Sequence, residues 1–132
     1  MAIRLFNDGA TIESRACQIW QILVGHAVRR QTMTYQDLAH LLGHNQPKVL
    51  ARQLGRIYNH CLENSLPLLT VLVVNKNTGE PGDGIEPEAE RGKLRERVYQ
   101  YDWYGLVPPT QDEYREAWEH AKHSSTVEDD QQ

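Results

Sequence analysis

Between residues 47 and 62 the sequence repeats long polar side chains at helical intervals. The residues at these intervals are Lys48, Arg52, Arg56 and Asn59. Steps of four, four and three residues put side chains on one outer face of a helix. Lysine and arginine neutralise phosphates, and the groove of a duplex is wide enough for one helix. The spacing therefore predicts a helix that contacts DNA, and an ordinary solvated helix face is the alternative interpretation.

Two further helices are predicted ahead of this one. Apolar residues recur at helical spacing over 16–28, which indicates a helix with one buried face. Thr34 is a suitable N-cap for a second, short helix, which Gly43 ends. Pro47 then stands where the third helix begins. A short helix, a tight turn and a longer basic helix in this order predict a helix-turn-helix.

The segment after the third helix predicts a strand and a turn. Residues 66–74 are apolar and rich in β-branched side chains, which is typical of a buried strand. The segment around Gly79 is rich in turn-forming residues and is the candidate wing. The predicted fold class is therefore α+β, a winged helix-turn-helix with an added C-terminal strand and helix.

The carboxyl-terminal part of the chain is predicted to supply the added strand and helix. Residues 85–96 are charged and weakly periodic and are interpreted as a connection. Alternation over 98–103 predicts a strand whose aromatic side chains pack in the core. We expect a winged-helix domain over 1–109, a helix over 110–123 that packs on it, and a disordered acidic tail over 124–132.

Length and charge set limits on the class of protein. A chain of 132 residues is one domain. Residues 1–60 carry seven Lys or Arg and three Asp or Glu, whereas residues 61–132 carry seven and fifteen. This asymmetry fits contact with a polyanion through one half, although uneven surface charge alone also explains it. No apolar run is long enough to span a membrane. The two cysteines are expected to be reduced thiols in a cytoplasm.

The ordered motifs of this chain resemble the DNA-binding domain of O6-alkylguanine-DNA alkyltransferases and the alkyltransferase-like proteins. The resemblance covers about residues 14–84. The segments that carry it are Thr34-Tyr35-Gln36-Asp37-Leu38-Ala39 with Leu42-Gly43, Arg52-Gln53-Leu54-Gly55, and Pro67 to Val74. They match, in order, the family's Ser/Thr-Tyr-x-x-Leu/Ile-Ala…Gly segment, its Arg-x-Val-Gly segment, and the position of its Pro-x-x-x-Pro-Cys-His-Arg-Val-Val segment.

The resemblance implies roles for individual residues. In that family the motif tyrosine helps to turn a nucleotide out of the base stack, and the motif arginine enters the duplex in its place. These roles would fall on Tyr35 and Arg52, and a planar guanidinium suits the second. Gly55 inside a helix is tolerable if another backbone packs closely there. The residues expected to bind DNA are Tyr35, Lys48, Arg52, Gln53, Arg56 and Asn59.

The family's Pro-Cys-His-Arg motif is absent from this chain. Residues 69–72 read Leu-Thr-Val-Leu, and no thiol stands at the nucleophile position. Alkyl transfer needs an activated thiolate with a base beside it. We therefore expect a non-enzymatic protein that binds duplex DNA, with recognition of a modified or flipped base left open.

Two alternatives to this hypothesis are weighed. The first is a protein–protein interaction module that uses the acidic carboxyl-terminal half on a winged-helix scaffold. The second is a zinc site formed from His40, His44, His60 and Cys61. Cys61 lies on the apolar face of its predicted helix, and Gly43 interrupts the helical spacing of the two histidines on either side of it. We therefore expect no metal and no cofactor.

Overall fold

A computed structural model describes residues 3–44, 47–75 and 88–131. Its helices and strands, in chain order, are α1 (Ile12–Val28), β1 (Met33–Thr34), α2 (Tyr35–Leu41), the 3-10 helix η1 (Pro47–Leu50), α3 (Ala51–Glu63), the 3-10 helix η2 (Leu69–Leu72), β2 (Val73–Val74), α4 (Glu88–Gln100) and α5 (Gln111–Gln131). No helix in these ranges is long and apolar enough to cross a membrane.

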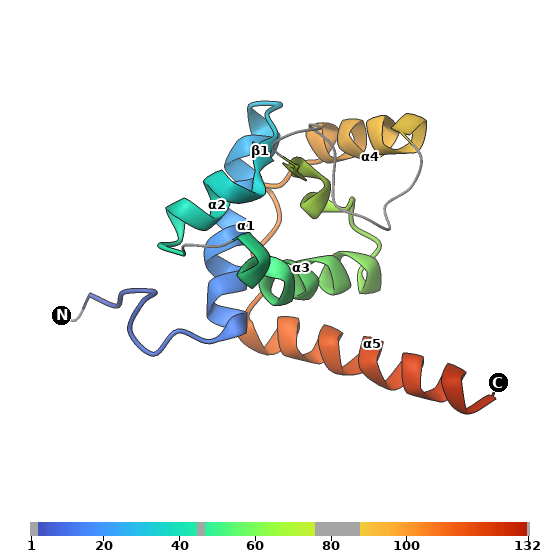
Figure 1. Cartoon of the computed structure of the whole chain (residues 1–132). Coiled ribbons are helices and arrows are strands. Elements are labelled where there is room, and N and C mark those ends of the chain that lie inside the picture. Colours follow the sequence, from blue (N-terminus) through green and yellow to red (C-terminus); the bar gives the residue numbers. More distant parts are fainter. Residues whose placement is uncertain (1–2, 45–46, 76–87, 132) are drawn as a thin grey trace.

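The helices pack around α1. Figure 1 shows α4 at one end of the molecule and α5 at the other, with α1 and α3 between them. The α5 helix packs mainly on α3 and also on α1, and η2 fills the space between α1, α3 and α4. The buried side chains of these elements form one continuous core. The α+β class is confirmed in its coarse form, since helices are joined by one small sheet of two parallel strands.

The predicted second and third helices are present as α2 and, after residues outside the described ranges, as η1 and α3. The Thr34 hydroxyl accepts a hydrogen bond from the backbone N–H of Asp37 at 3.0 Å, which confirms the predicted N-cap. Gly43 ends the second helix at φ +80°, a conformation that favours glycine. The guanidinium of Arg15 on α1 donates to the carbonyl of Leu42 at 3.3 Å and so ties the end of α2 to α1.

The long strand predicted over 66–74 is wrong. Only Val73 and Val74 are extended, and residues 69–72 form η2. Residues 71–74 are all buried rather than alternately buried and exposed. Since β1 offers only two residues for pairing, most of the apolar run has no strand partner and packs as a helical turn instead. The candidate wing around Gly79 lies outside the described residues.

The predicted connection over 85–96 and the predicted strand over 98–103 are corrected by α4. Residues 88–100 form one helix, in which Leu94 and Val98 face the core. This segment is rich in Glu, Arg and Lys, which are good helix formers. After α4 the chain turns, and the indole N–H of Trp103 donates to the carbonyl of Val98 at 2.7 Å. The burial expected for this aromatic side chain is confirmed at 2% exposure.

The C-terminal helix is longer than predicted. Thr110 and Glu113 form the expected capping box, with hydrogen bonds of 3.0 and 3.1 Å between the side chain of each residue and the backbone N–H of the other. The α5 helix then continues to Gln131, so the segment predicted as a disordered tail over 124–132 is helical up to that residue. Figure 1 shows this end of α5 extending beyond the other elements.

An aromatic cluster joins α1, α3 and α5. Trp20 on α1 makes edge-to-face contacts with His60 on α3 and Tyr114 on α5, with centroid separations of 6.0 and 6.4 Å. It also meets Trp103 at 5.5 Å. Burial lowers the pKa of His60, so this imidazole is neutral at pH 7 and packs as a ring.

Tyr114 provides a test of this packing. Its ring is fully buried, and its hydroxyl has no hydrogen-bond partner in the described part of the chain. An unsatisfied buried hydroxyl costs about 1–3 kcal/mol. We expect Tyr114→Phe to leave the free energy of unfolding unchanged or to raise it by about 1 kcal/mol. Tyr114→Ala should lower it by about 3–5 kcal/mol. Urea unfolding of the wild-type protein and the two variants measures both changes in the free energy of unfolding. A clear loss of stability in Tyr114→Phe would contradict the conclusion that the hydroxyl has no hydrogen-bond partner.

Candidate nucleic-acid interface

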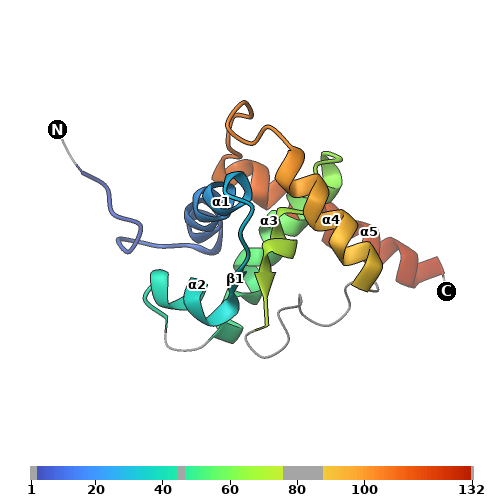
Figure 2. The same ribbon diagram turned by 90° about the horizontal axis from the view of Figure 1, so that it is seen from above.

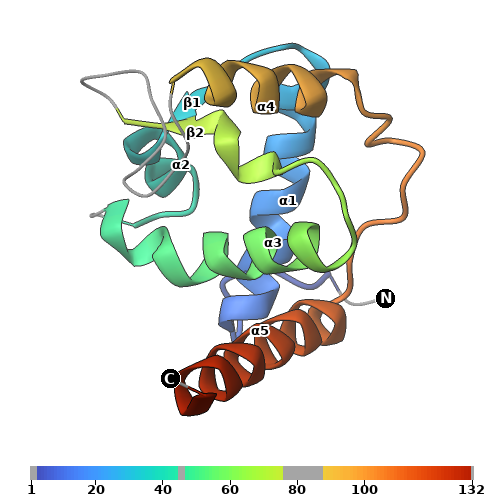
Figure 3. The same ribbon diagram turned by 90° about the vertical axis from the view of Figure 1, so that its right-hand side faces the viewer.

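The start of α3 presents the accessible part of the predicted DNA-binding helix. Lys48 lies on η1 and Arg52 lies one turn later on α3, and both side chains are exposed. Val49 is also 44% exposed, although it is apolar. Figures 2 and 3 place this end of the helix on an outer edge of the molecule, close to α2. The chain therefore offers two long cationic side chains on an open helical surface.

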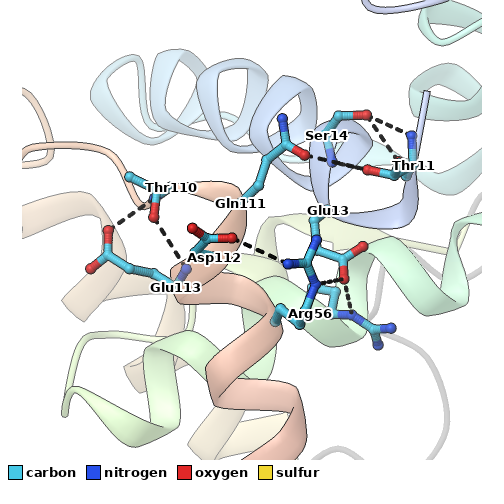
Figure 4. Close-up of polar contacts among 9 residues, drawn as sticks. Thr11, Glu13, Ser14, Arg56, Thr110, Gln111, Asp112 and Glu113 are labelled. Carbon is cyan, nitrogen blue, oxygen red and sulfur yellow. Dashed lines mark hydrogen bonds and ion pairs between the residues drawn. The ribbon is translucent and has the colours of Figure 1, made fainter. Parts of the chain in front are cut away.

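Arg56 does not share this outer face, and the prediction that it does is wrong. Its side chain is only 8% exposed, and it lies between α1 and α5. Its Nε atom lies 4.0 Å from the Glu13 carboxylate, as Figure 4 shows, and its guanidinium lies 4.2 Å from the centre of the Trp118 ring. Cation–π contact and the ion pair together hold this arginine inside the structure.

The charge on Arg56 is partly compensated. Burial lowers the pKa of its guanidinium, and the neighbouring Glu13 carboxylate opposes that shift. Arginine still remains protonated at neutral pH. The same carboxylate oxygen lies 3.4 Å from the Nε atom of Arg115 on α5. One glutamate at the start of α1 therefore pairs with arginines from two other helices.

Gln53 and Asn59 also face the protein interior or α5. Gln53 is 9% exposed, and Asn59 lines a groove between α3 and α5 together with Leu62 and His120. His120 makes a hydrogen bond to Glu63 across the same boundary, and this contact raises the pKa of the imidazole. The predicted stripe beyond Arg52 thus faces α5 or the interior, which explains why only its start is accessible.

Tyr35 stands at the first turn of α2. Its side chain is half-buried against the core, directly after β1. The role of this tyrosine in turning a nucleotide out of the base stack stays a prediction.

Gly55 lies on α3 one turn beyond Arg52, and the space around it is open. A Cβ atom added there would meet no other atom within 4 Å. Within the described residues, no backbone from another element packs closely at this glycine. Glycine inside a helix costs about 1 kcal/mol relative to alanine. The packing of the described residues therefore does not explain why a glycine, rather than an alanine, stands at this position.

The cysteines and histidines do not gather into a reactive site. Both cysteines are free, and burial raises the pKa of the Cys61 thiol to about 11. Burial also raises the pKa of Cys17, so both thiols stay protonated at neutral pH. His60 belongs to the aromatic cluster, whereas His40 is exposed on α2. Within residues 3–44, 47–75 and 88–131 no three metal-ligating side chains lie together.

Sequence reasoning missed the residues that bury Arg56. Trp118 lies on α5, and the sequence does not indicate that it packs on an arginine of α3. Glu13 is a single acidic residue at the start of α1, and sequence position gives no sign that it faces α3. The sequence does contain one sign of this packing, which is the apolar face of α5, because such a face needs another element to cover it.

No known protein family, curated protein or solved structure matches this chain.

The buried ion pair predicts a stability effect. Glu13→Gln leaves the Arg56 charge buried without its carboxylate, and breaking a buried pair costs about 3–5 kcal/mol. We expect the free energy of unfolding to fall by about 3 kcal/mol. The double variant Glu13→Gln/Arg56→Met removes both charges and should recover most of the loss. Denaturant unfolding of both variants measures this, and equal instability of the double variant would contradict the pairing.

Proposed function

We propose that this protein binds duplex DNA without enzymatic activity, through η1 and the start of α3, in the manner of alkyltransferase-like proteins on a winged-helix scaffold. The observation that carries the proposal is the pair of exposed cations, Lys48 on η1 and Arg52 at the start of α3. A helix of this kind fits a groove, and its cations neutralise phosphates.

Gly55 supports the same proposal. It lies next to Arg52 on the helix and has open space where a side chain would be. A glycine at such a place allows close approach of a ligand to the helix backbone. A duplex seated on the start of α3 therefore gives a physical reason for a glycine that the fold itself does not need.

Arg52→Ala tests the proposal directly. Loss of one phosphate or base contact should weaken DNA binding at least fivefold and reduce the slope of log K against log salt by about 0.9. Fluorescence anisotropy with a labelled duplex at several salt concentrations measures both quantities. Lys122→Ala removes a positive charge from α5, where the ammonium group lies 4.7 Å from the centre of the Trp118 ring, and serves as the matched control.

The outcomes of that experiment separate the hypotheses. Equal binding by Arg52→Ala and the Lys122→Ala control, with intact folding, would contradict the role of Arg52. The affinity for a second duplex that contains O6-methylguanine, compared with that for the unmodified duplex, tests whether a modified base is recognised. Absence of any binding by the wild-type protein at low salt would reject DNA as the ligand.

Gly55→Ala gives a second, independent test. The added methyl group should raise the free energy of unfolding by about 0.5–1 kcal/mol, because helical glycine is unfavourable. The same methyl group should weaken DNA binding, since it occupies the surface that the duplex approaches. Gly25→Ala on α1 is the matched control, because its Cβ meets only the Arg29 side chain, at an ordinary contact distance of 3.7 Å. It should stabilise the protein equally and leave the affinity for DNA unchanged. Undiminished DNA binding by Gly55→Ala would contradict the close approach.

The alternative function is recruitment of a protein partner through α5. This helix carries seven acidic and two basic residues, and its end extends beyond the other elements. A partner with a basic surface would fit it. The low-salt anisotropy experiment discriminates, since this function requires no DNA binding by the wild-type protein.

A further inference from the structure

The α4 helix carries a concentration of cations that the proposed interface does not include. Four of its thirteen residues are basic, and Arg30 at the end of α1 lies against it. The cations of this "α4 basic surface" are Arg30, Arg91, Lys93, Arg95 and Arg97. Three glutamates of α4 accompany them. The side chains of Arg91 and Arg95 are half-buried, whereas those of Lys93 and Arg97 are exposed.

The α4 helix begins on the same edge of the molecule as the start of α3. In Figure 2 the small sheet lies between α2 and α4, and η1, the end of β2 and the first turn of α4 all lie along one edge. Figure 3 shows the same three points along its left edge. Two views at right angles therefore agree that both helices start on one side, with the sheet between them.

The ion pairs on this surface are exposed and easily exchanged. Lys93 pairs with Glu90 at 3.3 Å, and Arg30 pairs with Glu96 at 3.1 Å, while about half or more of each side chain remains exposed. Exposed pairs of this kind contribute only about 0–1 kcal/mol. Arg30 also lies 5.5 Å from the centre of the Tyr99 ring, which holds its guanidinium against α4. A phosphate can therefore replace a carboxylate as the partner of these cations at little cost.

We propose that the α4 basic surface is a second phosphate-binding surface, which holds the backbone of the same duplex whose groove receives the start of α3. The inference rests on the proposed function. The small sheet spaces the two elements, so that α3 contacts the groove while α4 contacts phosphates beside it. Phosphate contacts of this kind set orientation rather than sequence preference.

A charge series on the wild-type background tests the inference. Lys93→Gln removes one exposed cation from α4, and Lys93→Gln/Arg97→Gln removes two from the same helix. Lys122→Gln on α5 is the matched control for a lost lysine charge. Affinity for a labelled 20-base-pair duplex is measured by anisotropy at several salt concentrations. Circular dichroism checks that the melting temperature of each variant is unchanged.

We expect the slope of log K against log salt to fall by about 0.9 for the single variant and about 1.8 for the double variant. Lys122→Gln should keep the wild-type slope. If the double variant behaves like Lys122→Gln while Arg52→Ala weakens binding, the α4 inference fails and the proposed function stands. If Lys122→Gln reduces the slope as much as Lys93→Gln, the effect is one of overall charge and the inference fails. Absence of salt-dependent binding by the wild-type protein rejects both the α4 inference and the proposed function.

Discussion

The packing of Trp20 fixes how the helices of this protein sit together. Its indole meets His60 of α3, Tyr114 of α5 and Trp103 of the segment after α4, each in an edge-to-face arrangement. Aromatic contacts of this kind contribute about 0.5–1.5 kcal/mol each beyond the burial of their area. Because the three partners come from three separate parts of the chain, a shift of any one of them disturbs the others. The position of α5 on α3 is therefore set by the same side chain that sets the position of α3 on α1.

That position of α5 determines which part of α3 is accessible. Once Tyr114 is packed beside Trp20, the following turn of α5 brings Trp118 over the guanidinium of Arg56. Glu13 approaches from α1 and compensates the charge. Arg56 is thereby buried, although its four-residue spacing from Arg52 is that of two residues on one helical face. Along the predicted stripe, the boundary between the accessible surface and the interior falls between these two arginines, one helical turn apart.

The sequence was sufficient where local chemistry decides structure. Thr34 and Gly43 gave the correct bounds of α2 because a cap and a positive φ depend on neighbours in the chain. The sequence was insufficient where the structure of a residue depends on a partner that lies far away along the chain. The run that ends in Val73 and Val74 has strand composition, yet its structure depends on whether a second strand is present to pair with it. The accessibility of Arg56 likewise depends on α5, which follows it by some fifty residues, so no local pattern predicts it.

Charge is distributed differently in space and along the chain. By sequence, the first 60 residues are basic and the remainder acidic. In the fold, the carboxyl-terminal half divides: α4, at one end of the molecule, has four cations and three glutamates, whereas α5, at the other end, has seven acidic and two basic residues. The start of α3 lies on the edge where α4 begins. A polyanion that approached the molecule would be attracted toward that edge and repelled by α5. The fold thus gives the molecule an electrostatic orientation that neither half of the sequence has by itself.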